Sequence, residues 1–198
     1  MNIVLIGYRC TGKTSVGRKL SERFHIPFYD TDELIIKHTG KTIREIVEEK
    51  GWESFRKEEK AVIRGLSSLS DTVIAAGGGA VMDPENREAL GRKGLFIWLT
   101  ADVRTIVERM KNDTAGDEQR PPLSSDGTEM ETSKILKNRM PIYQGLADFT
   151  VDTSRKGVDV IAEEVSNLLV RQNPHLTGRI SRNLSISSFL SRRDQERE

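Results

Sequence analysis

This sequence contains only one cysteine, carries almost no net charge and has no long hydrophobic run. One cysteine in 198 residues excludes an internal disulfide framework and is typical of a reducing compartment. A net charge of +1 argues against wholesale binding to nucleic acid or to a membrane. The apolar run at residues 2–6 lacks a basic flank and is too short for a signal peptide, and no run reaches the roughly 20 apolar residues of a spanning helix. We therefore expect a cytoplasmic protein.

The length and the charge distribution predict one domain with an appended tail. The 198 residues can form one α/β domain with a sizeable core but not two ordinary ones. From Arg171 onward, six arginines stand against three acidic residues, which gives this segment a charge of +3 and leaves −2 for residues 1–170. The segment is rich in serine and asparagine and fits either a partly ordered appendage or a weak amphipathic helix. We expect a domain over 1–170 and a basic extension over 171–198 of unknown role.

Short apolar runs alternate with helical patterns along the domain. The runs that read as strands are 2–6, 26–29, 72–76, 95–99 and 149–152. The helical patterns are 13–24, 32–38, 42–49, 53–69, 84–91, 102–111, 131–140 and 157–170. Such alternation favours a parallel sheet covered by helices on both faces. Ligands of such sheets bind at the carboxyl ends of the strands, so the residues after each strand are the candidate site.

The stretch GYRCTGKTS, residues 7–15, follows the first strand and matches G-x-x-x-x-G-K-[ST]. Its backbone N–H groups and the start of the next helix can hold a polyphosphate, while Lys13 reaches the phosphates and the Thr14 hydroxyl binds Mg²⁺. A chance glycine turn is the alternative. The residues expected to bind the nucleotide in this loop are Gly7, Cys10, Thr11, Gly12, Lys13, Thr14 and Ser15. Cys10 is either a small residue that fits the turn or a thiol with a lowered pKa at a helix start.

Carboxylates follow the second strand in the sequence DTD. Asp30 and Asp32 can face one cavity if the chain is extended, and a metal needs only one of them. Asp32 is then available to meet an acceptor hydroxyl. The alternative makes Asp32 the N-cap of the next helix and Asp30 a turn residue.

Three further motifs are ambiguous when taken singly. In FRKEE, Arg56 and Glu59 can pair on one helical face, which is also common on protein surfaces. The glycines at 77–79 follow the third strand and either let backbone N–H groups approach a ligand or form a tight turn. Arg139 precedes Pro141, which we expect to end or kink the helix, so that Arg139 points either into a cleft or into solvent.

Residues 112–128 interrupt the alternation with a polar segment rich in glycine, proline and aspartate. A loop of this length in a compact domain is usually functional or disordered. Because Arg120 precedes two prolines there, we expect a mobile lid that closes over phosphates, with a plain mobile loop as the alternative.

Taken in order, these motifs resemble the shikimate kinase family of P-loop enzymes, which are similar to nucleoside-monophosphate kinases. The order is the P-loop, D-x-D, F-R-x-x-E, G-G-G, a lid with R-P, R-x-P-x-Y and a final V-D-T strand. The resemblance extends from Asn2 to about Val170. It implies a three-layer α/β/α fold around a five-stranded parallel sheet, with ATP and Mg²⁺ as cofactors and shikimate as the substrate.

The resemblance also implies roles for individual residues on the nucleotide side. Lys13 and Thr14 would handle the phosphates and Mg²⁺, with Asp30 as a direct or indirect partner of the metal. Arg120 would reach both the γ-phosphate and the acceptor. The adenine would lie between the start of the lid, near Arg109 or Lys111, and the loop DTSRKG, where Arg155 is the expected contact.

On the acceptor side, the resemblance implies that Asp32 binds the hydroxyls as the candidate general base. Arg56 and Arg139 would grip the shikimate carboxylate, because a guanidinium can bind a carboxylate through two parallel hydrogen bonds. Glu59 would orient Arg56. Backbone groups of Gly78 and Gly79 would hold the ring hydroxyls.

Two residues depart from the pattern of many relatives. Cys10 stands where a glycine is common, and Val47 stands where a phenylalanine often lies beside the substrate ring. We expect a monomeric kinase that phosphorylates the 3-hydroxyl of shikimate without nucleic-acid or membrane partners. The alternatives are a kinase of another small polyol acid such as gluconate, and a nucleotide-binding module without turnover.

Overall fold

The computed structural model describes residues 1–113 and 129–173 and contains a five-stranded parallel sheet. The strands are β1 (Asn2–Ile6), β2 (Phe28–Asp30), β3 (Val73–Ala75), β4 (Gly94–Thr100) and β5 (Phe149–Asp152), in the order β2-β3-β1-β4-β5. The register places Leu5 of β1 beside Ala75 of β3 and Ile97 of β4. The expected parallel sheet is therefore confirmed.

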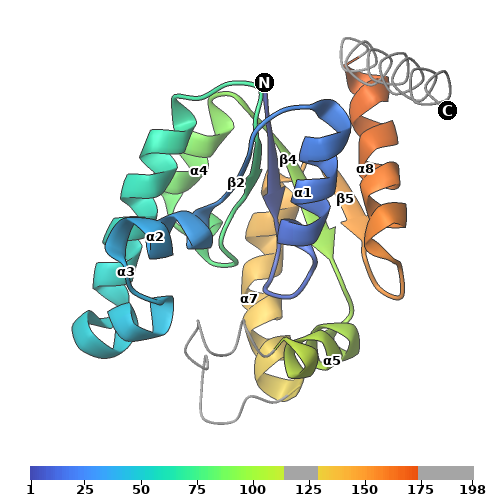
Figure 1. Ribbon diagram of the computed structural model, residues 1–198. Coiled ribbons are helices and arrows are strands. Elements are labelled where there is room, and N and C mark those ends of the chain that lie inside the picture. The colour runs from blue at the N-terminus through green and yellow to red at the C-terminus, as the bar shows by residue number, and fades with distance from the viewer. Residues whose placement is uncertain (114–128, 174–198) are drawn as a thin grey trace, which may run out of the picture.

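Helices cover both faces of this sheet and complete a three-layer α/β/α fold (Figure 1). They are α1 (Lys13–Phe24), α2 (Thr31–Thr39), α3 (Ile43–Ser67), the 3-10 turn η1 (Ala80–Met82), α4 (Pro84–Gly91), α5 (Val103–Asn112), α7 (Glu129–Leu146) and α8 (Val158–Gln172). Helices α1 and α8 pack on one face, while α3, α4 and α7 pack on the other.

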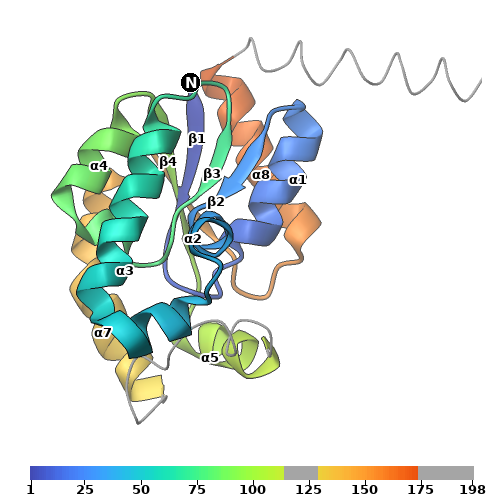
Figure 2. The same ribbon diagram turned by 60° about the vertical axis from the view of Figure 1, so that its left-hand side comes forward.

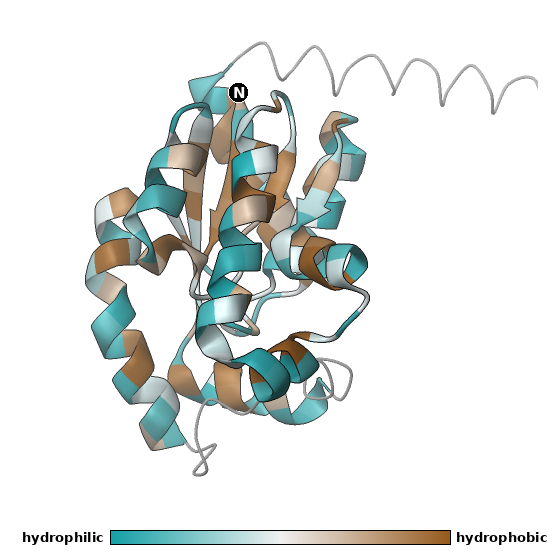
Figure 3. Ribbon diagram, turned by 90° about the vertical axis from the view of Figure 1, so that its left-hand side faces the viewer, coloured by the Kyte–Doolittle hydropathy of each residue, from teal (hydrophilic) through white to brown (hydrophobic). Residues whose placement is uncertain are grey.

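The alternation of side chains along β1 produces two separate cores. Ile3 and Leu5 point into the core with α1 and α8, whereas Val4 and Ile6 point into the core with α3 and α4. Because both faces of the strand are covered, all five residues of β1 are buried and the run is continuously apolar apart from Asn2. Figure 3 shows brown, hydrophobic strands between helices whose turns are largely teal.

Local capping explains where two of the helices begin. The Asp30 carboxylate accepts hydrogen bonds from the backbone N–H groups of Asp32 and Glu33 and is the N-cap of α2. The alternative in which Asp32 is the N-cap is therefore wrong. Thr42 and Glu45 form a capping box at the start of α3.

One expected helix interruption is confirmed and one expected helix end is wrong. The patterns at 42–49 and 53–69 both lie in the span of α3, and the backbone between them is non-helical at Gly51, with φ 76° and ψ 168°. A positive φ is accessible to glycine, so the chain can change direction there without strain. Pro141 lies inside α7, which continues to Leu146, so the proline does not end the helix.

Several expectations concern residues that lie outside the described ranges. These are most of the expected lid at 112–128, including Arg120, and residues 174–198 of the extension. Within the described ranges, no helix combines the length and the apolar composition needed to cross a membrane.

Candidate functional site

A cleft with a volume of about 640 Å³ opens at the carboxyl ends of the strands. Figure 2 shows these ends pointing toward the part of the molecule where α2 and α5 lie. The cleft is lined by residues of the P-loop, of α2 and α3, of the glycine loop at 77–79 and of the segment before α8. Its volume is in the range of small-molecule sites.

The P-loop curves tightly between β1 and α1. Gly7, Cys10 and Gly12 have φ values of 139°, 59° and 92°, so three of its residues use positive φ. A Cβ on Gly7 would lie 2.3 Å from the carbonyl oxygen of Leu99, which explains why only glycine fits there. Cys10 lines the cleft, and its Sγ lies 3.9 Å from Oδ2 of Asp113.

Lys13 bonds to the loop that precedes it. Its Nζ donates to the carbonyl oxygens of Gly7 at 3.0 Å and of Tyr8 at 2.6 Å. The Thr11 hydroxyl donates to the same Tyr8 carbonyl at 2.9 Å. The ammonium is thus fixed at the mouth of the loop, where bound phosphates would lie.

Thr14 and Asp30 connect the P-loop to the end of β2. The Thr14 hydroxyl donates to Oδ2 of Asp30 at 2.6 Å, and Oδ1 of Asp30 accepts from the Asp32 backbone at 2.9 Å. Burial, together with the nearby Asp32 carboxylate, raises the pKa of Asp30, although the Thr14 hydrogen bond opposes the shift. A cation beside these oxygens would relieve the cost of the buried charge, and hydroxyl and carboxylate oxygens suit Mg²⁺.

Arg56 extends from α3 into the cleft, and its guanidinium lies close to two aromatic rings. Its guanidinium carbon lies 5.0 Å from the ring centroid of Phe55 and 5.7 Å from that of Trp52. Nη1 donates to Oε2 of Glu59 at 2.6 Å, and the Glu59 side chain is 1% exposed. This pair is therefore not the solvated surface pair that its spacing also allowed.

The other Glu59 oxygen, Oε1, is buried without a hydrogen-bond partner among the described residues. Burial raises the pKa of Glu59, and the nearby Arg56 guanidinium partly opposes this shift. A Cβ added to Gly77 would lie 2.7 Å from Oδ1 of Asp32 and 3.1 Å from Oε1 of Glu59. The two carboxylates therefore converge on this glycine.

The glycine loop also touches both arginines of the acceptor side. A Cβ on Gly79 would lie 2.6 Å from Nη2 of Arg56, so a larger residue would displace the guanidinium. Arg139 donates from Nη1 to the Gly78 carbonyl at 2.9 Å, and the Tyr143 hydroxyl donates to the same oxygen. The glycines serve close approach here, and Arg139 lines the cleft.

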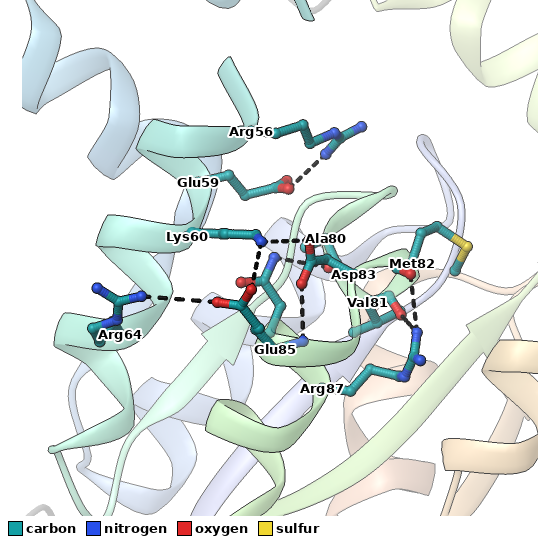
Figure 4. A network of polar contacts seen from close by, with 11 residues as sticks. Arg56, Glu59, Lys60, Arg64, Ala80, Val81, Met82, Asp83, Glu85 and Arg87 are labelled. Atoms are coloured by element: carbon teal, nitrogen blue, oxygen red, sulfur yellow. Dashed lines mark hydrogen bonds and ion pairs between the residues drawn. The ribbon is translucent and has the colours of Figure 1, made fainter. Parts of the chain in front are cut away.

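A polar network holds the chain segment that follows the glycine loop, as Figure 4 shows. Lys60 of α3 pairs with Asp83 at 2.9 Å and with Glu85 at 3.0 Å, at the start of α4. Arg87 donates to the carbonyl oxygens of Val81 and Met82, both in the η1 turn. Since Glu59 and Lys60 are adjacent on α3, the network connects the helix that carries Arg56 to the chain that follows the glycines.

At the nucleotide end, the structure distinguishes between the residues expected near adenine. Arg109 donates to the Thr153 carbonyl at 2.7 Å and to the Cys10 carbonyl at 3.2 Å, and it lines the cleft. Lys156 and Gly157 line it as well, whereas Arg155 and Lys111 are not among the lining residues.

Sequence reasoning did not anticipate every residue of the cleft wall. Tyr8, Arg9 and Trp52 line the cleft. Val47 is not among the lining residues and packs against the buried cluster that contains Ile35. The variable positions of a P-loop motif carry no constraint that would have singled out Tyr8 and Arg9. The predicted residues that the structure brings to the cleft are Cys10, Gly12, Lys13, Thr14, Ser15, Asp30, Asp32, Arg56, Glu59, Gly78, Gly79 and Arg139.

The arrangement can bind a polyphosphate at one end and a small anion with hydroxyl groups at the other. No cluster of three or more His, Cys, Asp or Glu side chains suited to a metal occurs in residues 1–113 and 129–173. A metal held here would therefore depend on the phosphates of a bound nucleotide for several of its ligands.

Comparison with known proteins gives one consistent family. The shikimate kinase family model matches residues 9–170. A shikimate kinase from Syntrophus aciditrophicus is 48% identical over 172 residues, which cover 83% of this chain and 88% of the relative.

Solved structures agree with this match. A shikimate kinase from Acinetobacter baumannii, solved in complex with shikimate, has a TM-score of 0.80 and 34% identity, with 87% of this chain and 94% of the other covered. A shikimate kinase from Aquifex aeolicus has a TM-score of 0.72 and 32% identity, with 89% and 99% covered.

Proposed function

The chain belongs to the shikimate kinase family, and from this premise we propose that it transfers the γ-phosphoryl group of ATP to the 3-hydroxyl of shikimate. The product would be shikimate 3-phosphate, an intermediate of aromatic amino-acid biosynthesis. The observation that carries the proposal is that Arg56 and Arg139 line the same cleft as the P-loop. Two guanidinium groups opposite a phosphate-binding loop suit a small carboxylic acid that accepts a phosphoryl group.

The P-loop supports ATP as the nucleotide. Its backbone N–H groups and the start of α1 would hold the phosphates, and Lys13 would exchange its bonds to the Gly7 and Tyr8 carbonyls for bonds to phosphate oxygens. Arg109, Lys156 and Gly157 line the end of the cleft where the base would lie.

Thr14 and Asp30 would hold Mg²⁺ beside the phosphates. Their oxygens form one hydrogen-bonded pair at the mouth of the loop, and among the described residues the hydrogen bonds of the buried Asp30 carboxylate come from a hydroxyl and from backbone N–H groups. When bound, the metal neutralises charge that develops on the phosphoryl oxygens.

Asp32 would bind the hydroxyl that attacks. It follows the Asp30 cap on the first turn of α2, is 8% exposed, and lies at the glycine loop beside Glu59. An acceptor held by Arg56 and Arg139 through its carboxylate would present hydroxyl groups toward this carboxylate. Asp32 would then orient the hydroxyl and take its proton.

Arg120 remains a predicted contributor from the expected lid. A cation from a closing segment would stabilise charge on the transferred group and help to exclude water, which is the competing acceptor. We further propose that the enzyme works as a monomer in the cytoplasm, and its single cysteine supports a reducing compartment.

The test is release of ADP from ATP and Mg²⁺ in a coupled assay. Shikimate, gluconate, a nucleoside monophosphate and no acceptor are compared in parallel. Release with shikimate alone is the expected result, and mass spectrometry of the product should show one added phosphoryl group. Release with gluconate alone would instead establish the polyol-acid alternative, and nucleotide binding without release in any sample would favour a non-catalytic module.

A further inference from the structure

Tyr8 has its backbone in the phosphate-binding loop. It follows Gly7 directly, and its carbonyl oxygen accepts hydrogen bonds from Lys13 at 2.6 Å and from Thr11 at 2.9 Å. Any displacement of this residue would therefore move the acceptor of the Lys13 ammonium.

The Tyr8 ring lies on the acceptor side of the same cleft. The guanidinium carbon of Arg139 lies 5.7 Å from the ring centroid, and the hydroxyl is hydrogen-bonded to Thr132 of α7. The residue is 1% exposed. A cation that is desolvated against an aromatic face is attracted to it by the ring quadrupole.

Arg139 also contacts the glycine loop and Tyr143. Nη1 donates to the Gly78 carbonyl at 2.9 Å, and the Arg139 side chain is hydrogen-bonded to the Tyr143 hydroxyl. These hydrogen bonds lie at the edge of the guanidinium, whereas the Tyr8 ring supplies a surface beside the group that hydrogen bonds do not provide. The plane of the guanidinium matters because a carboxylate accepts two parallel hydrogen bonds only in that plane.

We propose that Tyr8 is a positioning residue for the acceptor, and that its ring orients Arg139 for binding the acceptor carboxylate. This inference rests on the proposed function. Because the same residue shapes the phosphate loop, the loop itself sets where the acceptor lies relative to the nucleotide. The two substrates must meet in line for phosphoryl transfer, so this arrangement contributes alignment.

The experiment compares Tyr8→Leu with Tyr8→Phe. Loss of the ring should raise the KM for shikimate and its calorimetric Kd by roughly 3- to 30-fold, the range expected for a cation over an aromatic ring, while the KM for ATP changes less. Tyr8→Phe keeps the ring and should stay within about twofold of the unaltered protein. Phe24→Leu is the matched control, because Phe24 is fully buried in the core between the sheet and α1, away from the cleft, and should leave both KM values unchanged.

A double-mutant cycle separates positioning from a general structural role. In an Arg139→Gln background, with shikimate titrated into the millimolar range, Tyr8→Leu should change the Kd by less than about twofold, because the residue through which it acts is gone. An undiminished effect in that background, or an equal rise of KM in Tyr8→Phe, would overturn the inference. Absence of shikimate binding by the unaltered protein would overturn the proposed function and this inference with it, whereas shikimate binding that is indifferent to Tyr8→Leu would overturn this inference alone.

Discussion

Oε2 of Glu59 accepts a 2.6 Å hydrogen bond from Nη1 of Arg56, while Oε1 of the same carboxylate is buried without a partner among the described residues. A buried charge with one unsatisfied oxygen is costly, so its contribution must be sought in what it does for the arginine. The pair fixes a guanidinium in the cleft rather than stabilising the surface of α3.

Replacement of Glu59 by glutamine should therefore impair acceptor binding. We expect the KM for shikimate to rise roughly tenfold, since the acceptor of the Arg56 hydrogen bond changes from a carboxylate to a neutral amide and the ion pair is lost, with little change in the KM for ATP. Steady-state kinetics with each substrate varied in turn measures the effect. Glu53→Gln is the control on the same helix, because Glu53 pairs with Lys57 at 3.1 Å on an exposed surface. Equal effects of the two substitutions would refute the role of Glu59.

Replacement of Asp32 by asparagine should remove the proton acceptor while keeping the shape of the site. Turnover should fall by at least about a hundredfold, a typical contribution of a general base. ADP binding, followed by calorimetry, should persist because the P-loop is intact. Glu88→Gln is the control, since Glu88 pairs with Arg92 at 3.0 Å on the exposed surface of α4 and is not among the residues that line the cleft. Undiminished turnover would exclude Asp32 as the acceptor-side carboxylate.

Replacement of Asp30 by asparagine should have opposite effects on stability and on metal use. Burial raises the pKa of Asp30, so the native state keeps this proton at pH values where the unfolded chain has lost it. The stability that the unaltered protein gains from neutral Asp30 is fully present below the pKa of Asp30 in the unfolded chain. This stability is lost as the pH rises through the higher pKa of Asp30 in the folded protein. Relative to the unaltered protein, the variant should thus gain free energy of unfolding as the pH rises above about 4, the ordinary pKa of an aspartate in an unfolded chain.

Urea unfolding at several pH values measures the gain in free energy of unfolding. The Mg²⁺ dependence of turnover measures the loss of metal binding in the same variant. We expect the Mg²⁺ concentration for half-maximal activity to rise about tenfold, as for partners of metal ligands in general. A variant whose relative stability is independent of pH would contradict the raised pKa. Unchanged Mg²⁺ dependence would show that Asp30 does not serve the metal.

Truncation after Asn173 should leave the domain intact. The core between the sheet and α8 is complete at Leu169, which is fully buried, and α8 ends at Gln172. We expect turnover within about a factor of two of the full chain and an unchanged melting temperature. An insoluble or inactive product would instead show that residues 174–198 are required.

The sequence predicts those parts of the site whose residues belong to short local motifs. The P-loop spacing, the Asp30 and Asp32 pair and the glycine run follow strands, and strand ends of a parallel sheet must meet, so their convergence could be expected. The parts that escaped prediction depend on long-range packing. The cation–π contact of Arg139 with the Tyr8 ring joins residues 131 positions apart, and no local pattern encodes it.

The same limit explains the difference at the end of α7. Pro141 lies inside this helix, which continues to Leu146, although residue type favours an end before the proline. At the nucleotide end, Arg109 of α5 donates to the Cys10 carbonyl and lines the cleft, whereas Arg155, with φ 56°, is not among the lining residues. The contact of Arg155 with adenine stays a prediction.

The bonds from Lys13 to the carbonyl oxygens of Gly7 and Tyr8 have a consequence for the kinetics of nucleotide capture. The loop is held in shape by its own lysine before any phosphate arrives, so little conformational entropy remains to be lost on association. Nucleotide entry then requires an exchange of two hydrogen bonds at one ammonium group and no refolding of the loop. Association should accordingly be fast, and differences in affinity among nucleotides should lie mainly in their dissociation rates.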